Sequence, residues 1–227
     1  MNSYRWYRLG VGRRPVKRAE VLALFEHRPQ SSCTFSLIRS DKTGIYADFS
    51  WRHFVMLERV SDEGEYFEDH LEVRSSMQIS FRGSSTFPLL RVVDGGRNIR
   101  VLIDALEGAL GHEFFFESVP FNMDLGASLE SNKLLDSCKL VGAKVTDLRV
   151  ADGVLSRVEF AARQGMSLSL IDFLRGKDFK IELMKYEVLR SGIRGGISFG
   201  KSGRVLVSGA LEEFLVNFVE SEVNAAS

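Results

Sequence analysis

Apolar and polar residues alternate with a period of two along much of this chain, a pattern typical of half-buried β-strands. In residues 71–81, every second side chain from Leu71 onward falls on one side of the predicted strand. Residues 45–60 give a second strand, whose first half places Ile45, Phe49 and Trp51 on one face. The acidic segment 62–69 between these two strands is expected to be a polar loop.

Two segments instead repeat apolar residues at i, i+3, i+4 and i+7, as amphipathic helices do. The first is 99–110, where Asn98 is a candidate N-cap and Gly111 a candidate end of the helix. The second is the last helix, which carries Leu211, Leu215 and Phe218 on one stripe. Shorter helices are expected after Pro15 and over residues 167–174.

Two β-hairpins are predicted in the second half of the chain. Strands at 140–150 and 155–162 flank an Asp-Gly pair at positions 152 and 153, which is a strong hairpin signal. Short strands at 197–199 and 205–207 form the other hairpin. Together with the alternating segments of the first half, they indicate antiparallel pairing.

Strands occur in runs rather than in regular alternation with helices, which argues against a doubly wound parallel sheet. We therefore predict an α+β fold: mostly antiparallel sheets with a few amphipathic helices, arranged as two packed subdomains. Residues 122–137 fit no element clearly, so the boundary is placed there, between an N-terminal subdomain at 1–122 and a C-terminal one at 138–227. A single domain is the alternative.

Composition narrows the class of protein. The chain has 227 residues, 44% of them apolar, with 30 basic and 30 acidic side chains. A chain of this size can bury a core without disulfides or metals, and its overall charge favours neither nucleic acid nor a membrane as partner. Residues 1–18 lack the apolar stretch of a signal peptide, and no segment is apolar enough to span a bilayer. We expect a soluble, cytoplasmic protein with no membrane partner.

The chemistry-bearing residues are few. Cys33 and Cys138 are expected to be small buried hydrophobes, with a disulfide between them left open. The four histidines are scattered without ligand spacing, so neither a metal site nor a cofactor is predicted.

A glycine-rich segment at 195–202 matches the P-loop pattern G-x-x-x-x-G-K-[ST]. In a P-loop, a helix starts straight after the loop and its N-terminus helps to bind phosphate. Residues 203–207 instead have a strand pattern that begins with Gly203. We therefore expect a hairpin turn here. Nucleotide binding is the alternative, through four residues: Gly195, Gly200, Lys201 and Ser202.

A basic cluster with interleaved aromatic residues lies at the N-terminus. Its members are Arg5, Arg8, Arg13, Arg14, Lys17 and Arg18, with Tyr4, Trp6 and Tyr7 between them. Arginine and lysine neutralise phosphates, and aromatic rings stack on unpaired bases. The alternatives are an ordinary solvated face, a surface for an acidic protein, or a patch covered by the acidic segment 62–72 of the same chain.

A metal-dependent nuclease would need an Asp, and then a Glu and a Lys two positions apart on one strand. Asp178, Glu182 and Lys185 come nearest, but Glu182 and Lys185 are three apart and so point to opposite faces. We therefore predict a non-catalytic binding protein with a protein partner, as a subunit of a larger assembly, and with nucleic acid as a second candidate partner. An enzyme, nucleotide-binding or nuclease, is the alternative.

Overall fold

The computed structural model describes residues 1–26, 32–60, 66–83, 88–111, 113–120, 123–151, 153–167 and 174–225. The chain forms two compact units. The first unit is Trp6–Glu117, and the second unit combines Met1–Arg5 with Ser118–Ser227. The helix expected at 167–174 lies almost entirely outside the described residues.

The predicted α+β class is wrong. The structure is mostly antiparallel β-sheet, with 57% strand and 21% helix. Hydrogen bonding links twelve strands in one network, and four α-helices lie in the described ranges. The strands are longer than the alternation indicated, because β4 (Gly44–Val60) and β5 (Tyr66–Gly83) continue as a pair well beyond the part that covers a core. Part of the segment expected to be a loop, residues 66–69, belongs to β5.

In the first unit the strands follow the order β3-β4-β5-β6-β1, and β2 and β7 both pair with β1. The other elements of this unit, with their bounds, are β1 (Asn2–Val11), β2 (Arg14–Pro15), α1 (Arg18–Ala23), β3 (Cys33–Asp41), β6 (Pro88–Val93), a 3-10 turn (Gly96–Asn98), α2 (Ile99–Leu110) and β7 (Phe114–Ser118). The predicted helix at 99–110 is confirmed, although the Asn98 side chain makes no cap hydrogen bond.

The core of the first unit lies on one face of β4 and β5. Phe49 and Ile45 of β4 are fully buried, and they pack in one cluster with Leu102 and Leu106 of α2. The predicted faces of both the strand and the helix are therefore the ones that meet.

In the second unit the order is β1-β12-β11-β10-β8-β9. Its elements are α3 (Met123–Glu130), β8 (Ser137–Ala151), β9 (Val154–Ala161), β10 (Lys180–Arg190), β11 (Ile193–Gly200), β12 (Arg204–Gly209) and α4 (Glu212–Ala225). Residues Asn2–Arg5 of β1 pair with β12. Both hairpins predicted in this half are present, as β8–β9 and β11–β12.

Candidate functional site

The glycine-rich segment is a β-hairpin. Gly195 pairs with Gly209 across β11 and β12, and it is buried against Leu211, so its backbone is not open to a phosphate. Lys201 and Ser202 occupy the turn, and a strand rather than a helix follows at Arg204. The structure thus shows the hairpin that the strand pattern predicts, and it lacks the helix N-terminus of a P-loop.

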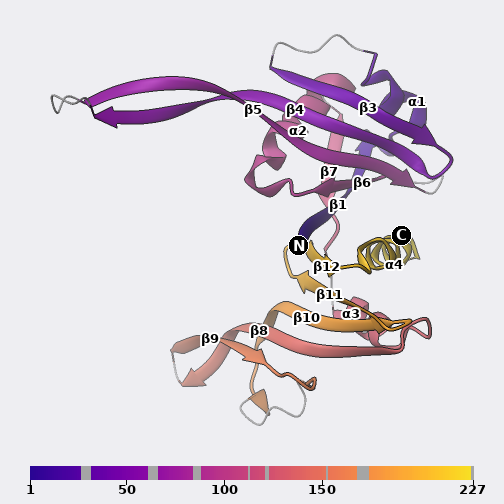
Figure 1. Cartoon of the computed structure of the whole chain (residues 1–227), viewed down its shortest axis with the longest axis vertical. Helices are drawn as coiled ribbons and strands as arrows, with labels where there is room; N and C mark the ends of the chain where they lie inside the picture. Colours follow the sequence, from indigo (N-terminus) through magenta and orange to yellow (C-terminus); the bar gives the residue numbers. More distant parts are fainter. Residues whose placement is uncertain are drawn as a thin grey trace. The chain divides into compact units, whose positions relative to one another are not determined.

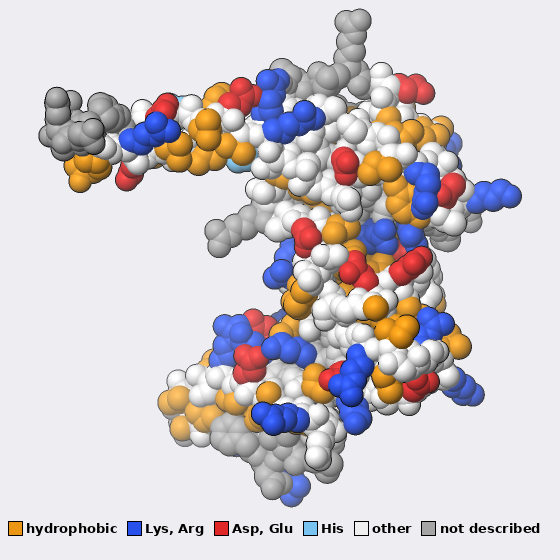
Figure 2. Space-filling model, viewed as in Figure 1, with side chains coloured by type: hydrophobic (Ala, Val, Ile, Leu, Met, Phe, Trp, Pro, Cys, Tyr) orange, Lys and Arg blue, Asp and Glu red, His pale blue; other side chains and the backbone are white. Residues whose placement is uncertain are grey.

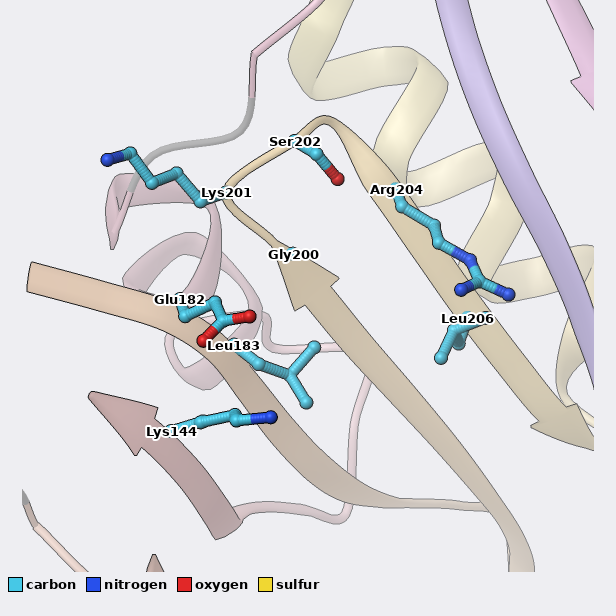
Figure 3. Close-up of a pocket in the computed structure, with 8 residues that line it drawn as sticks. All are labelled: Lys144, Glu182, Leu183, Gly200, Lys201, Ser202, Arg204 and Leu206. Atoms are coloured by element: carbon cyan, nitrogen blue, oxygen red, sulfur yellow. The ribbon is translucent and has the colours of Figure 1, made fainter. Parts of the chain in front are cut away.

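A pocket of about 580 Å³ adjoins this turn, with Lys144, Glu182, Gly200, Lys201 and Arg204 among its lining residues. Figure 3 shows that its basic side chains do not converge, because Lys201 points away from Lys144 and Glu182. The Arg204 guanidinium instead donates a hydrogen bond to the Ser3 hydroxyl, with an Nε–Oγ distance of 2.9 Å. The pocket therefore offers no cluster of cations aimed at one anion.

Three of the charges on β10 (Lys180, Glu182 and Lys185) form ion pairs across the sheet. These ion pairs are Glu182 with Arg157, Lys185 with Glu159 at 2.9 Å and Lys180 with Asp147 at 2.8 Å. The hydrogen bond from Lys185 lowers the pKa of Glu159, and that from Lys180 lowers the pKa of Asp147. Among the described residues no group of three His, Cys, Asp or Glu side chains could hold a metal ion. The arrangement is one of alternating surface charge.

Both cysteines are free thiols and half-buried. Burial, with the Glu130 carboxylate nearby, raises the pKa of Cys138 to about 12. Because the thiolate is the reactive form, Cys138 is not an activated nucleophile.

The N-terminal cluster divides between the two units, with Arg5 in the second and the remaining basic residues in the first. Tyr4, Trp6 and Tyr7 are all buried, so these rings offer no surface on which bases could stack. Arg5 and Arg8 are half-buried. The exposed members form what we call the basic corner, around β2 and the start of α1: Arg13, Arg14, Lys17 and Arg18.

Two arginines of the basic corner have partners within the chain. Arg14 donates to Glu20, with an Nη1–Oε2 distance of 2.8 Å. This bond, together with one from the Lys17 backbone amide, lowers the pKa of Glu20 to about 2. Arg18 donates to the Ser40 hydroxyl at 2.6 Å and to the Asp41 carbonyl at 2.9 Å. Within the described residues, the side chains of Arg13 and Lys17 have no such partner.

The most unusual feature of the first unit is a β-ribbon that projects from its body (Figure 1). β4 and β5 pair without a bulge from Ile45–Phe81 to Val60–Tyr66. β3 accompanies β4 only to Trp51, and β6 accompanies β5 only from Gln78 onward. We call the unaccompanied part, residues 52–60 and 66–74, the arm. The described acidic residues of segment 62–72 are Glu68, Asp69 and Glu72, and all three lie in the arm. The basic corner instead contacts the β3–β4 turn, at the other end of β4. Within the described residues the acidic segment therefore does not cover the basic corner.

One face of the arm is both apolar and charged. This face, which we call the charged face, carries the even-numbered residues of the arm. They are Arg52, Phe54, Met56, Glu58, Val60, Tyr66, Glu68, His70, Glu72 and Arg74. Phe54 is 71% exposed and Tyr66 is 82% exposed. Figure 2 shows hydrophobic side chains and both signs of charge along this ribbon. Large exposed apolar side chains gathered in one place are typical of interaction surfaces.

Sequence reasoning missed the arm. The alternation predicts strands at 45–60 and 71–81, but alternation alone does not show where a strand leaves its core. Two features of the sequence indicate the arm. The predicted strand at 45–60 is unusually long, and beyond Trp51 it has apolar residues at both odd and even positions, such as Phe54, Val55 and Met56.

No known protein-family model matches this sequence, and no curated protein is significantly similar to it. None of the helices in the described ranges is long and apolar enough to cross a membrane. The fold and its surfaces define an antiparallel β-protein with a projecting two-stranded arm.

Proposed function

We propose that this protein is a non-catalytic interaction protein, a subunit of an assembly, and that the arm is its main docking element. The exposed apolar face of the arm is the observation that carries the proposal. Phe54, Met56, Val60 and Tyr66 all stand on one face of a ribbon that no other described strand accompanies.

Two energetic arguments support an interaction role for the arm. Leaving large apolar side chains in water forgoes about 25 cal/mol for each Å² that burial would remove from solvent. An isolated two-stranded ribbon is also only marginally stable in water. A protein surface that covers the charged face would remove its apolar side chains from water and would stabilise the ribbon.

The test is to remove the arm without touching the core. Replacing residues 54–72 with Asn-Gly would join His53 to Val73, which are directly opposite in the ladder, through a two-residue turn. Tagged full-length and shortened proteins would be recovered from the native cells and their bound proteins quantified. Lys201→Ala, in an exposed turn of the second unit, is the matched control.

The full-length protein and the control are expected to retain the same protein, either an untagged copy of this chain or another chain, and the shortened protein to lose it. Recovery of the same proteins with and without the arm would contradict the proposal. Circular dichroism of the shortened protein would show that its core remains folded.

The basic corner remains a prediction of a second contact, with nucleic acid or with an acidic protein. Arg13 and Lys17 are the residues to reverse, because reversing Arg14 or Arg18 would also break contacts within the chain. Arg13→Glu/Lys17→Glu should weaken any salt-dependent binding to short DNA or RNA and lower its salt dependence. Unchanged binding would exclude these two residues as the contact.

A further inference from the structure

We propose that the charged face of the arm docks on the same face of a second copy of this chain, with the two arms antiparallel about a two-fold axis. This inference rests on the proposed function, and it identifies the partner. It follows from the order of charges along the arm.

The charged face is self-complementary from its base to its tip. The directly opposite pairs on this face follow one another from base to tip. They are Arg52 with Arg74, Phe54 with Glu72, Met56 with His70, and Glu58 with Glu68. The base of the face thus carries a pair of cations, and the region near the tip carries a pair of carboxylates. A two-fold axis that lies between the two faces and perpendicular to the strands reverses the direction of one arm, so base meets tip twice.

An axis level with Val55 and Leu71 brings the matching side chains together. Across this axis β4 lies over β4, and β5 over β5. Arg52 then faces Glu58 of the second copy, Arg74 faces its Glu68, and Phe54 faces its Met56. Each of these contacts occurs twice, because a two-fold interface uses one patch on both subunits.

The carboxylate pair gives an independent reason for a cationic partner. Glu58 and Glu68 occupy directly opposite positions, where like charges destabilise a β-ladder. Within the described part of the chain neither carboxylate has an ion-pair partner. At the base, Arg52 contacts Glu72 at 3.1 Å and Arg74 donates to the Ser50 hydroxyl, which leaves the base positive overall. A second copy would place that positive base against the two carboxylates.

Other arrangements of two arms lack this match. If the arms were parallel, Glu58 and Glu68 would face the same two carboxylates of the second copy, and these like charges would repel each other. The opposite face of the arm continues the core face of the sheet and has a single pair of unlike charges near the tip, Arg59 and Asp69, so it carries no such pattern. Among the arm residues whose side chains the structure describes, five large apolar side chains are exposed, and four of them lie on the charged face.

Charge reversal tests the proposal by sedimentation equilibrium of the full chain at low salt. Arg52→Glu/Arg74→Glu makes the whole face negative, and Glu58→Arg/Glu68→Arg makes it positive. We expect the parent protein to dimerise, and each variant alone to do so about tenfold more weakly or worse. An equimolar mixture of the two variants should form a heterodimer, because every base–tip contact is again between opposite charges. The quadruple variant should recover the homodimer.

Lys42→Glu/Arg100→Glu reverses two exposed cations of the same unit outside the arm and should leave dimerisation unchanged. A parent that is monomeric at about 100 μM, which is well above the dissociation constant of a dimer with micromolar affinity, would overturn the inference. So would variants that dimerise like the parent, or a mixture that does not associate. The parent could instead be monomeric and bind a different protein that is lost when the arm is removed. That result would overturn the dimer but leave the proposed function standing, so the two failures are distinguishable.

Discussion

Glu58 of β4 and Glu68 of β5 lie directly opposite each other near the tip of a ribbon, on its exposed apolar face. Two carboxylates at this position repel each other across the ladder. The arrangement costs stability in a single chain and provides a recognition element when a cationic surface covers it.

Neutralising one of these carboxylates should therefore affect the arm and the dimer in opposite directions. Glu58→Gln is expected to stabilise the arm of the dilute monomer by a few tenths of a kcal/mol, because it removes the repulsion. Amide hydrogen exchange in β4 and β5, measured well below the dimerisation constant, should slow, whereas self-association should weaken. Faster exchange in the arm would contradict the proposed repulsion, and Lys42→Gln, in the turn between β3 and β4, is the control.

The close approach of α3 to β10 gives a prediction about stability. A Cβ added at Gly126 would lie 2.3 Å from the hydroxyl oxygen of Tyr186, which is buried. Alanine normally favours a helix by about 1 kcal/mol over glycine, but overpacking costs about 1–3 kcal/mol. Gly126→Ala should therefore lower the free energy of unfolding. Tyr186→Phe in the same chain should restore part of the loss, because it removes the closest atom but leaves the ring Cζ 3.0 Å from the new Cβ.

Chemical denaturation of the three proteins measures this prediction. A Gly126→Ala protein at least as stable as the parent would show that α3 does not pack against Tyr186 as closely as the geometry indicates.

The turn between β11 and β12 contains a matched pair of substitutions. Lys201→Ala should change stability by no more than about 0.5 kcal/mol, because its side chain is exposed. Gly203 has φ of +77°, and a Cβ there would lie 2.5 Å from the Val119 carbonyl oxygen. Gly203→Ala should thus destabilise the chain by about 1–3 kcal/mol.

The same pair separates a hairpin from a nucleotide site. Thermal unfolding with and without Mg-ATP is the measurement, and neither variant should alter the response to nucleotide. A nucleotide-induced stabilisation that Lys201→Ala abolishes would contradict the hairpin interpretation.

Glu20 should make stability depend on pH. Its pKa lies near 2 in the folded chain, against an ordinary value of 4.5, because Arg14 and the Lys17 amide bond its carboxylate. A lowered folded-state pKa contributes stability that is present above about pH 4.5 and is lost as the pH falls toward 2. Since this ion pair is exposed, the contribution is at most about 1 kcal/mol.

The check is to compare the parent with Glu20→Gln. The difference in free energy of unfolding should be largest at neutral pH and shrink between pH 4.5 and 2. A carboxyl carbon of Glu20 that titrates by NMR near 4.5 would contradict the prediction.

Local signals in the sequence predicted the local elements well. The helix at 99–110 and the hairpin around Lys201 follow from side-chain period and from glycine, so their positions needed no knowledge of the rest of the chain. The arm did not follow, because alternation shows that a segment forms a strand but not where that strand leaves the core. Polar, acidic residues such as Glu68 and Asp69 are typical of loops, so the sequence predicts a loop at 66–69, although these residues belong to β5.

Alternation along the sequence also does not predict that the N-terminal aromatic residues are buried. Tyr4, Trp6 and Tyr7 include neighbours of opposite parity on β1, so alternation predicts that some of them face solvent. β1 instead pairs with elements of both units, and all three rings are covered. Their proximity to arginines in the sequence therefore did not create a base-stacking surface.

The most direct test of the antiparallel dimer is the distance between spin labels on the two arms, measured by double electron–electron resonance. Val60→Cys would carry the label in a chain with Cys33 and Cys138 replaced by serine and alanine. Val60 is five residues from the proposed axis, so at about 3.3 Å per residue and about 10 Å between faces the two labels should lie roughly 35 Å apart. A label at Val55 is level with the axis but on the opposite face of the arm, so its distance depends on the thickness of the paired arms alone and should be clearly shorter. Equal short distances at both positions would indicate parallel arms, and the absence of any intermolecular distance would contradict the dimer.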